Sequence, residues 1–273
     1  MQYLILRKFA CTLALTLVPC TAAFAVSTWN FSSCNSNAAN SAGGTPFGNT
    51  WSCSEAGGGG AVAVTGWATT GTSVSGAAIY ESAYVSPQGG SGFGIRNRQE
   101  GTGSPNHAAD NSGYTDMFAF NFDTKVDLTG VTIGWRQTDS DISVLRYTGA
   151  DAPTISGRTT PGLLSNGWKL VGDYSDLATG ATRAVNTADG NIGVNDGASS
   201  WWLISAYNAS YGGASWSAGN DYFKLLSVAG NVAPPDNGVP EPASLALVGL
   251  AMLGAAGGLR RKRRSIPELA QPV

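Results

Sequence analysis

The sequence FAFNF at residues 118–122 decides the fold class of this 273-residue chain. Its three phenylalanines alternate with smaller residues, which places them on one face of an extended strand. The sequence VTIGW at residues 131–135 repeats the pattern with Val131, Ile133 and Trp135. Asp123-Thr124-Lys125 between the two segments, and Thr138-Asp139-Ser140 after them, resemble short turns. These patterns predict neighbouring antiparallel strands joined by hairpins.

Six further segments show the same alternation, with turn residues between them: 61–69, 76–85, 141–147, 168–174, 200–206 and 221–229. Helical periodicity is nearly absent. Eight tryptophans and nine tyrosines provide core material that disordered segments lack. We therefore predict an all-β fold, an antiparallel β-sandwich of the jelly-roll type, as one ectodomain over residues 26–230.

The N-terminus has the features of a secretory signal peptide. Arg7 and Lys8 precede an apolar stretch at residues 9–18, and Ala23-Phe24-Ala25 supplies the small residues that a signal peptidase recognises. We predict export by the Sec machinery and cleavage after Ala25. A buried N-terminal helix and a lipoprotein signal ending at Cys20 are the alternatives.

Cleavage after Ala25 would leave two cysteines in the mature chain, Cys34 and Cys53. Two thiols in an exported protein indicate one disulfide, here closing a loop rich in Asn, Gly and Ser. Two free thiols, or half of a metal site, remain the alternative.

The C-terminus combines three features in a fixed order. Val239-Pro240-Glu241-Pro242 comes first, and an uncharged, mostly apolar run follows at residues 243–259. Seventeen residues form a helix of about 25 Å, enough to cross a bilayer core. A basic cluster then holds the far end on the cytoplasmic side; it consists of Arg260, Arg261, Lys262, Arg263 and Arg264. We predict a linker at 231–238, a transmembrane helix at 243–259 and a short cytoplasmic tail at 265–273.

This arrangement, at residues 239–264, resembles the PEP-CTERM signal of bacterial proteins processed by an exosortase. The resemblance implies transient anchoring in the inner membrane, recognition at Pro240-Glu241-Pro242 by the exosortase, and delivery to the cell surface or the extracellular space. Because the class is associated with bacteria that produce exopolysaccharide, it also implies a role in the extracellular matrix or biofilm. The family signal usually stops sooner after its basic cluster than the nine residues seen here.

Phrases of the ectodomain resemble one group of exosortase-dependent surface proteins: GFGIRNRQE at 92–100, NHAADN at 106–111, IGW at 133–135 with DSD at 139–141, WWLISAY at 201–207, and DYFKL at 221–225. That group has no established catalytic residues to transfer to this chain.

Charge narrows the range of partners. Residues 26–238 contain 16 carboxylates and 9 Lys or Arg, a net charge of −7, whereas the positive charges gather at the two ends. An acidic ectodomain argues against binding nucleic acid or anionic lipid, since both need a basic face.

The ectodomain offers little for catalysis, and we expect no enzyme. It contains one histidine, His107, for which Asp110 or Asp116 would have to act as the orienting carboxylate, and no serine in a G-x-S-x-G setting. A glycan hydrolase would need two carboxylates flanking the bond, for which Glu81 and Glu100 are the candidates.

Two oxygen-rich segments suit a structural calcium ion, the only cofactor that we consider. Asp110, Asn111 and Asp116 form the first segment, and Asp139 and Asp141 the second. Hard oxygen ligands from loops are what Ca²⁺ takes. Capping of turns is the alternative role for these side chains.

Aromatic side chains near the end of the ectodomain suggest contact with glycans. Tyr207, Tyr211 and Trp216 lie in a stretch rich in Gly and Ser, and flat rings stack on sugar faces. The alternative is that these rings fill the core; alternation requires one of Trp201 and Trp202 to face inward.

We therefore expect an exported bacterial surface or matrix protein, sorted by an exosortase, with a structural or adhesive role in biofilm or exopolysaccharide. A secreted carbohydrate-binding module is the alternative, with a glycan hydrolase behind it.

Overall fold

The computed structural model describes residues 26–36, 46–55, 58–101, 103–185 and 197–232, together with residues 249, 251 and 252. The described chain is built mostly of strands, which confirms the predicted all-β class. The strands are β1 (Val26–Asn30), β2 (Asn35–Ser36), β3 (Thr50–Ser54), β4 (Ala61–Thr72), β5 (Ala78–Ser82), β6 (Tyr84–Pro87), β7 (Phe93–Arg96), β8 (Ala109–Asp110), β9 (Asp116–Thr138), β10 (Ile142–Tyr147), β11 (Trp168–Tyr174), β12 (Thr182–Ala184), β13 (Ser199–Ala206) and β14 (Asp221–Val232). The helices are short: α1 (Thr160–Leu164) and the 3-10 turns η1 (Phe31–Ser33), η2 (Gly89–Ser91) and η3 (Ala209–Tyr211).

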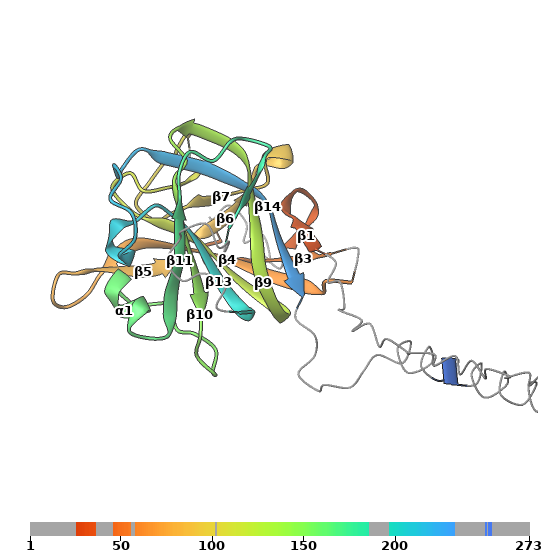
Figure 1. The fold of residues 1–273 in the computed structure, drawn as a ribbon. Coiled ribbons are helices and arrows are strands. Elements are labelled where there is room, and N and C mark those ends of the chain that lie inside the picture. The colour runs from red at the N-terminus through yellow and green to blue at the C-terminus, as the bar shows by residue number, and fades with distance from the viewer. Residues whose placement is uncertain are drawn as a thin grey trace, which may run out of the picture. The chain divides into compact units, whose positions relative to one another are not determined.

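Hydrogen bonds join these strands into one network. Its main path runs β11-β10-β13-β9-β14-β7-β6, and the named strands pair antiparallel throughout (Figure 1). Because the strands form one network, the jelly-roll sandwich of two separate sheets stays a prediction.

Strand β9 organises this network. Its first part, from Asp116 to Phe122, pairs with β4 on one side and β13 on the other, whereas residues 126–138 pair with β14. A straight strand of 23 residues would span about 75 Å. Side chains from both parts nevertheless enter one core, so β9 bends at its exposed residues 123–125.

The predicted alternation of phenylalanines produces this core. Phe118, Phe120 and Phe122 are all buried, and the Phe120 ring stacks on Phe31 at 5.8 Å between centroids. Val131 and Ile133 enter the same core from the second part of β9. Burying one such side chain contributes about 1.5–3 kcal/mol, which explains why the alternation predicts the strand so well.

The opposite face of the same strands is covered as well. Met117 and Ala119 alternate with the phenylalanines and pack with Leu145 and Leu203, beneath Ile155 and the α1 residue Leu163. Both faces of β9 are therefore buried near its start.

The structure corrects two predicted hairpins. Asp123-Thr124-Lys125 lies inside β9 and joins two parts that pair with different strands. The turn at Thr138-Asp139-Ser140 leads to β10, which pairs with β11 and β13 rather than with β9. The hairpin prediction was wrong because short polar segments occur equally where a strand bends and where the chain moves to a more distant strand.

Strand boundaries differ in places from the prediction. The segment 76–85 divides into β5, which pairs with β4, and β6, which pairs with β7. Strands β1 and β3 were not predicted; they adjoin the loop rich in Asn, Gly and Ser that the disulfide closes.

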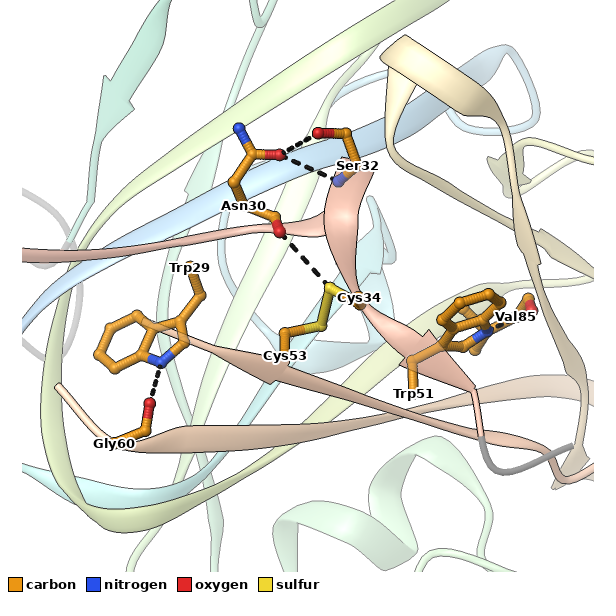
Figure 2. The surroundings of a disulfide bond; sticks show 8 residues. All are labelled: Trp29, Asn30, Ser32, Cys34, Trp51, Cys53, Gly60 and Val85. Carbon is orange, nitrogen blue, oxygen red and sulfur yellow. Dashed lines mark hydrogen bonds between the residues drawn. A yellow bond between two sulfur atoms is a disulfide. The ribbon is translucent and has the colours of Figure 1, made fainter. Parts of the chain in front are cut away.

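A disulfide joins Cys34, just after η1, to Cys53 in β3, as the sequence led us to expect (Figure 2). It lies between two tryptophans that are anchored by their ring nitrogens: Trp29 Nε1 donates to Gly60 O at 3.1 Å, and Trp51 Nε1 donates to Val85 O at 2.9 Å. The bond thus fastens the N-terminal strands where they meet the main core.

The chain divides into two compact units, the first ending at Val232 and the second beginning at Ala233. The predicted signal peptide at 1–25 lies outside the described residues, as does nearly all of the predicted transmembrane helix at 243–259. Among the described residues, no helix has the length and apolar character needed to cross a membrane.

Candidate functional site

Three carboxylates from separate segments converge in the first unit. Glu100 follows β7, Asp110 lies in β8, and Asp116 begins β9; one oxygen of each lies within 4.8 Å of the others. Asp110 and Asp116 are buried, at 1% and 0% exposure, and Glu100 is half-buried. We call these three residues the carboxylate cluster.

Asn97 positions two members of the carboxylate cluster. Its Oδ1 accepts hydrogen bonds from the backbone N–H groups of Gln99 and Glu100, both at 3.0 Å, which fixes the turn that carries Glu100. Its Nδ2 donates to Asp116 Oδ1 at 3.3 Å. A single buried amide therefore connects the turn after β7 to the start of β9.

The third member, Asp110, is fixed through the backbone of β8. Ala109 and Asp110 pair with Phe223 and Tyr222 of β14. The segment leading into β8 packs closely on β7, since a Cβ atom built on Gly94 would lie 1.8 Å from the His107 carbonyl oxygen. Only glycine fits at that position, and the close approach holds Asp110 beside the other two carboxylates.

The carboxylate cluster leaves two oxygens without partners. Asp110 Oδ1 accepts from the Ser112 N–H at 2.9 Å. Asp116 Oδ2 and Glu100 Oε2, however, are buried and have no hydrogen-bond partner. Among the described residues the other buried atoms without a partner are Trp168 Nε1 and Asn220 Oδ1. Native proteins contain few such atoms, so two in one cluster call for an explanation.

Burial and mutual repulsion disfavour negative charge in the carboxylate cluster. Burial, followed by the Glu100 charge, raises the pKa of Asp110 to about 7. Burial raises the pKa of Asp116 well above its usual range, and Asp110 and Glu100 raise it further. Burial also raises the pKa of Glu100. No Lys or Arg side chain contributes to the pKa shifts of these three carboxyl groups.

A second group of three acids, Asp139, Asp141 and Asp176, has the same spacing, within 4.8 Å, but different partners. Asp139 Oδ1 accepts from the Ser140 N–H at 2.8 Å, and Asp139 Oδ2 accepts from Asn220 Nδ2 at 3.2 Å. Asp141 Oδ1 accepts from the Asp176 N–H at 2.8 Å, while Asp176 itself is exposed. Asp139 and Asp141 therefore accept hydrogen bonds from the chain around them.

Asn111 belongs to neither group, although we expected it beside Asp110 and Asp116 as a calcium ligand. Its side chain is fully used in bonds to the backbone and to Asp221: Nδ2 donates to Tyr207 O and to Asp221 Oδ2, and Oδ1 accepts from the N–H groups of Gly219 and Asp221. The structure uses this residue elsewhere: Asn111 follows β8, and its side chain turns toward Tyr207 and Asp221. The third acid beside Asp110 and Asp116 is Glu100. It lies ten residues before Asp110, so there was no reason from the sequence alone to group the two.

The aromatic residues proposed to contact glycans are not gathered on the surface. Tyr207 and Tyr211 are buried, at 0% and 4% exposure, so their predicted exposure was wrong. The Tyr211 hydroxyl lies 2.7 Å from that of Tyr80, and Tyr207 donates to Ala214 O at 2.7 Å. Trp216 is 38% exposed and packs on Tyr207. Tyr207 follows β13 and Tyr211 ends η3, so both rings pack inward, whereas the loop at residues 212–220 is mostly exposed.

The structure shows instead a groove of about 470 Å³ at which Trp67 of β4 and Trp201 of β13 meet. Both tryptophans are half-buried residues, and Asn121 of β9, the strand between β4 and β13, also lines the groove. Thr50, Ala63, Thr65 and residues 153–156 complete the lining. Sequence alternation marked Trp201 or Trp202 as outward-facing, but the partner ring from β4 could be found only once the strand pairing was known.

The residues considered for catalysis lie apart from this groove. Glu81 Oε2 accepts from Thr70 Oγ1 at 3.3 Å, and Glu100 belongs to the carboxylate cluster. His107 is half-buried, and its backbone carbonyl packs on Gly94. The Asp110 carboxylate, proposed to orient His107, accepts from Ser112 instead.

The residues of the predicted sorting signal, Val239 to Pro242 and Arg260 to Arg264, lie outside the described residues. Comparison with known families identifies them: residues 238–264 match the PEP-CTERM protein-sorting motif. No curated protein and no solved structure matches the chain. The motif confirms the resemblance drawn from the sequence: the chain carries a PEP-CTERM sorting domain, which supports an exported protein that is sorted by an exosortase.

Proposed function

We propose that this protein is a non-catalytic component of the bacterial surface or extracellular matrix. The single observation that carries the proposal is the sorting motif at residues 238–264, downstream of a β-domain that ends at Val232. The disulfide between Cys34 and Cys53 supports a location outside the cytosol, where such bonds persist. The segment 243–259 would hold the chain in the inner membrane only until the exosortase cuts near Pro240-Glu241-Pro242.

Changing the motif tests this proposal. The double variant Pro240→Ala with Glu241→Ala should stay in the membrane fraction at full length, whereas the wild type appears at the cell surface in a shortened form. The control is Pro234→Ala with Pro235→Ala, which changes two prolines outside the matched residues. Normal processing of the motif variant, or loss of processing in the control, would contradict the proposed recognition.

The groove between Trp67 and Trp201 favours a second candidate function, binding of the host's own exopolysaccharide. Two half-buried tryptophans offer flat apolar faces for sugar rings, and Asn121, Thr50 and Thr65 offer polar groups beside them. Carboxylates are not among the residues that line this groove, in keeping with binding rather than glycan hydrolysis. Such binding would retain the released ectodomain within the matrix.

Retention on purified exopolysaccharide tests this second function. Trp67→Ala and Trp201→Ala should each weaken binding by about tenfold or more, since each removes a stacking face. Trp216→Ala is the matched control, because Trp216 is also partly exposed but does not line the groove. Equal retention of all three variants would exclude the groove as the binding site.

A further inference from the structure

The carboxylate cluster lacks a counter-charge in the structure as described. Glu100, Asp110 and Asp116 bring three acidic groups within 4.8 Å, and Asp116 is completely buried. The nearby Arg98 points elsewhere: its guanidinium donates to Ser82 O and Ser82 Oγ and lies over the Phe47 ring. Burying a charge without a partner is among the least favourable arrangements in a protein.

Each proton taken up by the cluster removes one negative charge, but it supplies no donor from outside the cluster. Asp116 Oδ2 and Glu100 Oε2 have no hydrogen-bond partner in the structure, whereas buried carboxylates are ordinarily satisfied by donors from the surrounding protein. A divalent cation placed among the three carboxylates would give their buried oxygens a partner and would offset most of their negative charge.

We propose that the carboxylate cluster is a calcium-binding site, with Glu100, Asp110 and Asp116 as its protein ligands. Oxygen-only ligands exclude the metals that prefer nitrogen or sulfur. Calcium accepts flexible coordination by six to eight oxygens, whereas magnesium requires a near-ideal octahedron. Three carboxylates would supply part of this shell, and water or backbone carbonyls would supply the rest. Glu100 is half-buried, and its neighbour Gln99 is exposed.

The role of the bound ion would be structural. It would connect the turn after β7, strand β8 and the start of β9, which are 10 and 6 residues apart in the chain and are held together by the Asn97 amide and the close packing on Gly94. Exported proteins meet calcium outside the cytosol, so the ectodomain would reach its full stability only after export.

Thermal unfolding of the full chain in detergent tests the site. At a calcium concentration about 100-fold above the dissociation constant, the unfolding midpoint should rise by about 5–10 °C relative to EDTA, and magnesium should have a smaller effect. Isothermal titration should give one calcium per chain. Asp116→Asn should abolish the rise, whereas the matched control Asp176→Asn, in the second acidic group, should retain it.

The EDTA condition separates a metal site from an ordinary structural role. Because Asp116→Asn removes a buried charge while its Oδ1 can still accept from Asn97, the variant should unfold in EDTA at or above the temperature of the wild type. If Asp116→Asn does not fold, Glu100→Gln at the half-buried position serves for the same comparison. Equal midpoints of the wild type in EDTA and calcium, or loss of the calcium effect in Asp176→Asn, would overturn the proposal.

Discussion

The β-domain and the sorting segment of this protein encode their information in opposite ways. Residues 238–264 form a short linear signal that is recognised from adjacent residues alone. The β-domain brings its functional candidates together from distant positions, such as Glu100, Asp110 and Asp116, or Trp67 and Trp201. The sorting of the chain can therefore be predicted from the sequence alone. The candidate sites of the β-domain cannot, because they depend on which strands pair and in which register.

Transplanting the sorting segment should give the largest effect, because processing is all or none. Residues 233–273 fused to an unrelated exported protein should cause exosortase-dependent cleavage of that protein, as judged by immunoblotting of cell fractions. The same fusion with Pro240→Ala and Glu241→Ala is the control and should remain uncut. If the fusion is not cleaved, the β-domain is also needed for cleavage, and the two regions are not independent.

Removing the disulfide should affect only the β-domain. Cys34→Ser with Cys53→Ser opens a loop with a sequence separation of 19 residues, which should lower the free energy of unfolding by about 3 kcal/mol. Urea unfolding measures the loss, and a reductant should reproduce it in the wild type. Sorting of the folded variant should be unchanged; a sorting defect in protein that is still folded would connect the two regions.

Much of the fold was predictable because burial imposes a local pattern. The alternation of Phe118, Phe120 and Phe122 specified a strand and its core face, and all six further segments contain strands. Strand pairing was harder to predict from the sequence. Residues 123–125 look like a hairpin turn, yet they join two parts of β9 that pair with different strands.

The candidate sites were only partly predictable for the same reason. Asp110 and Asp116 were identified as acids near a strand, but Glu100 approaches them only through the turn held by Asn97. Tyr207 and Tyr211 looked exposed because glycine and serine surround them, whereas tertiary packing buries both rings. Local composition does not report contacts between distant segments.

The close packing at Gly94 provides a more local test of the β-domain. Gly94→Ala places a methyl group against the His107 carbonyl, and should lower the free energy of unfolding by about 2–3 kcal/mol. It should also weaken the calcium effect, because the displaced segment leads to Asp110. Gly90→Ala is the control, since a Cβ there meets no atom within 4 Å. Equal stability of the two variants, measured by urea unfolding, would show that this packing does not position the site.

Asp221 should contribute to a pH dependence of stability, in the same direction as the other buried acids Asp110, Asp116 and Asp141. Burial raises the pKa of Asp221 to about 7, although hydrogen bonds from the Asp141 N–H and Asn111 Nδ2 oppose the rise, and the charges of Asp141 and Asp139 add to it. The folded state therefore holds a proton that the unfolded state releases near pH 4. The contribution of Asp221 to stability should therefore fall as pH rises from about 4 to about 7, and then level off.

Urea unfolding in EDTA at pH 5 and pH 8 measures this change. Asp221→Asn should reduce the difference between the two pH values, even though it loses one accepted hydrogen bond and is less stable at both. An undiminished difference in the variant would assign the pH dependence to other groups. Sorting in cells should not follow this titration, since the signal lies outside the β-domain.

Mass spectrometry of the mature C-terminus tests the central claim most directly. In wild-type cells the protein should end near Pro240-Glu241-Pro242, without residues 243–273, and in exosortase-deleted cells it should retain Val273. An intact C-terminus in wild-type cells, or the same shortened C-terminus without the exosortase, would contradict the account.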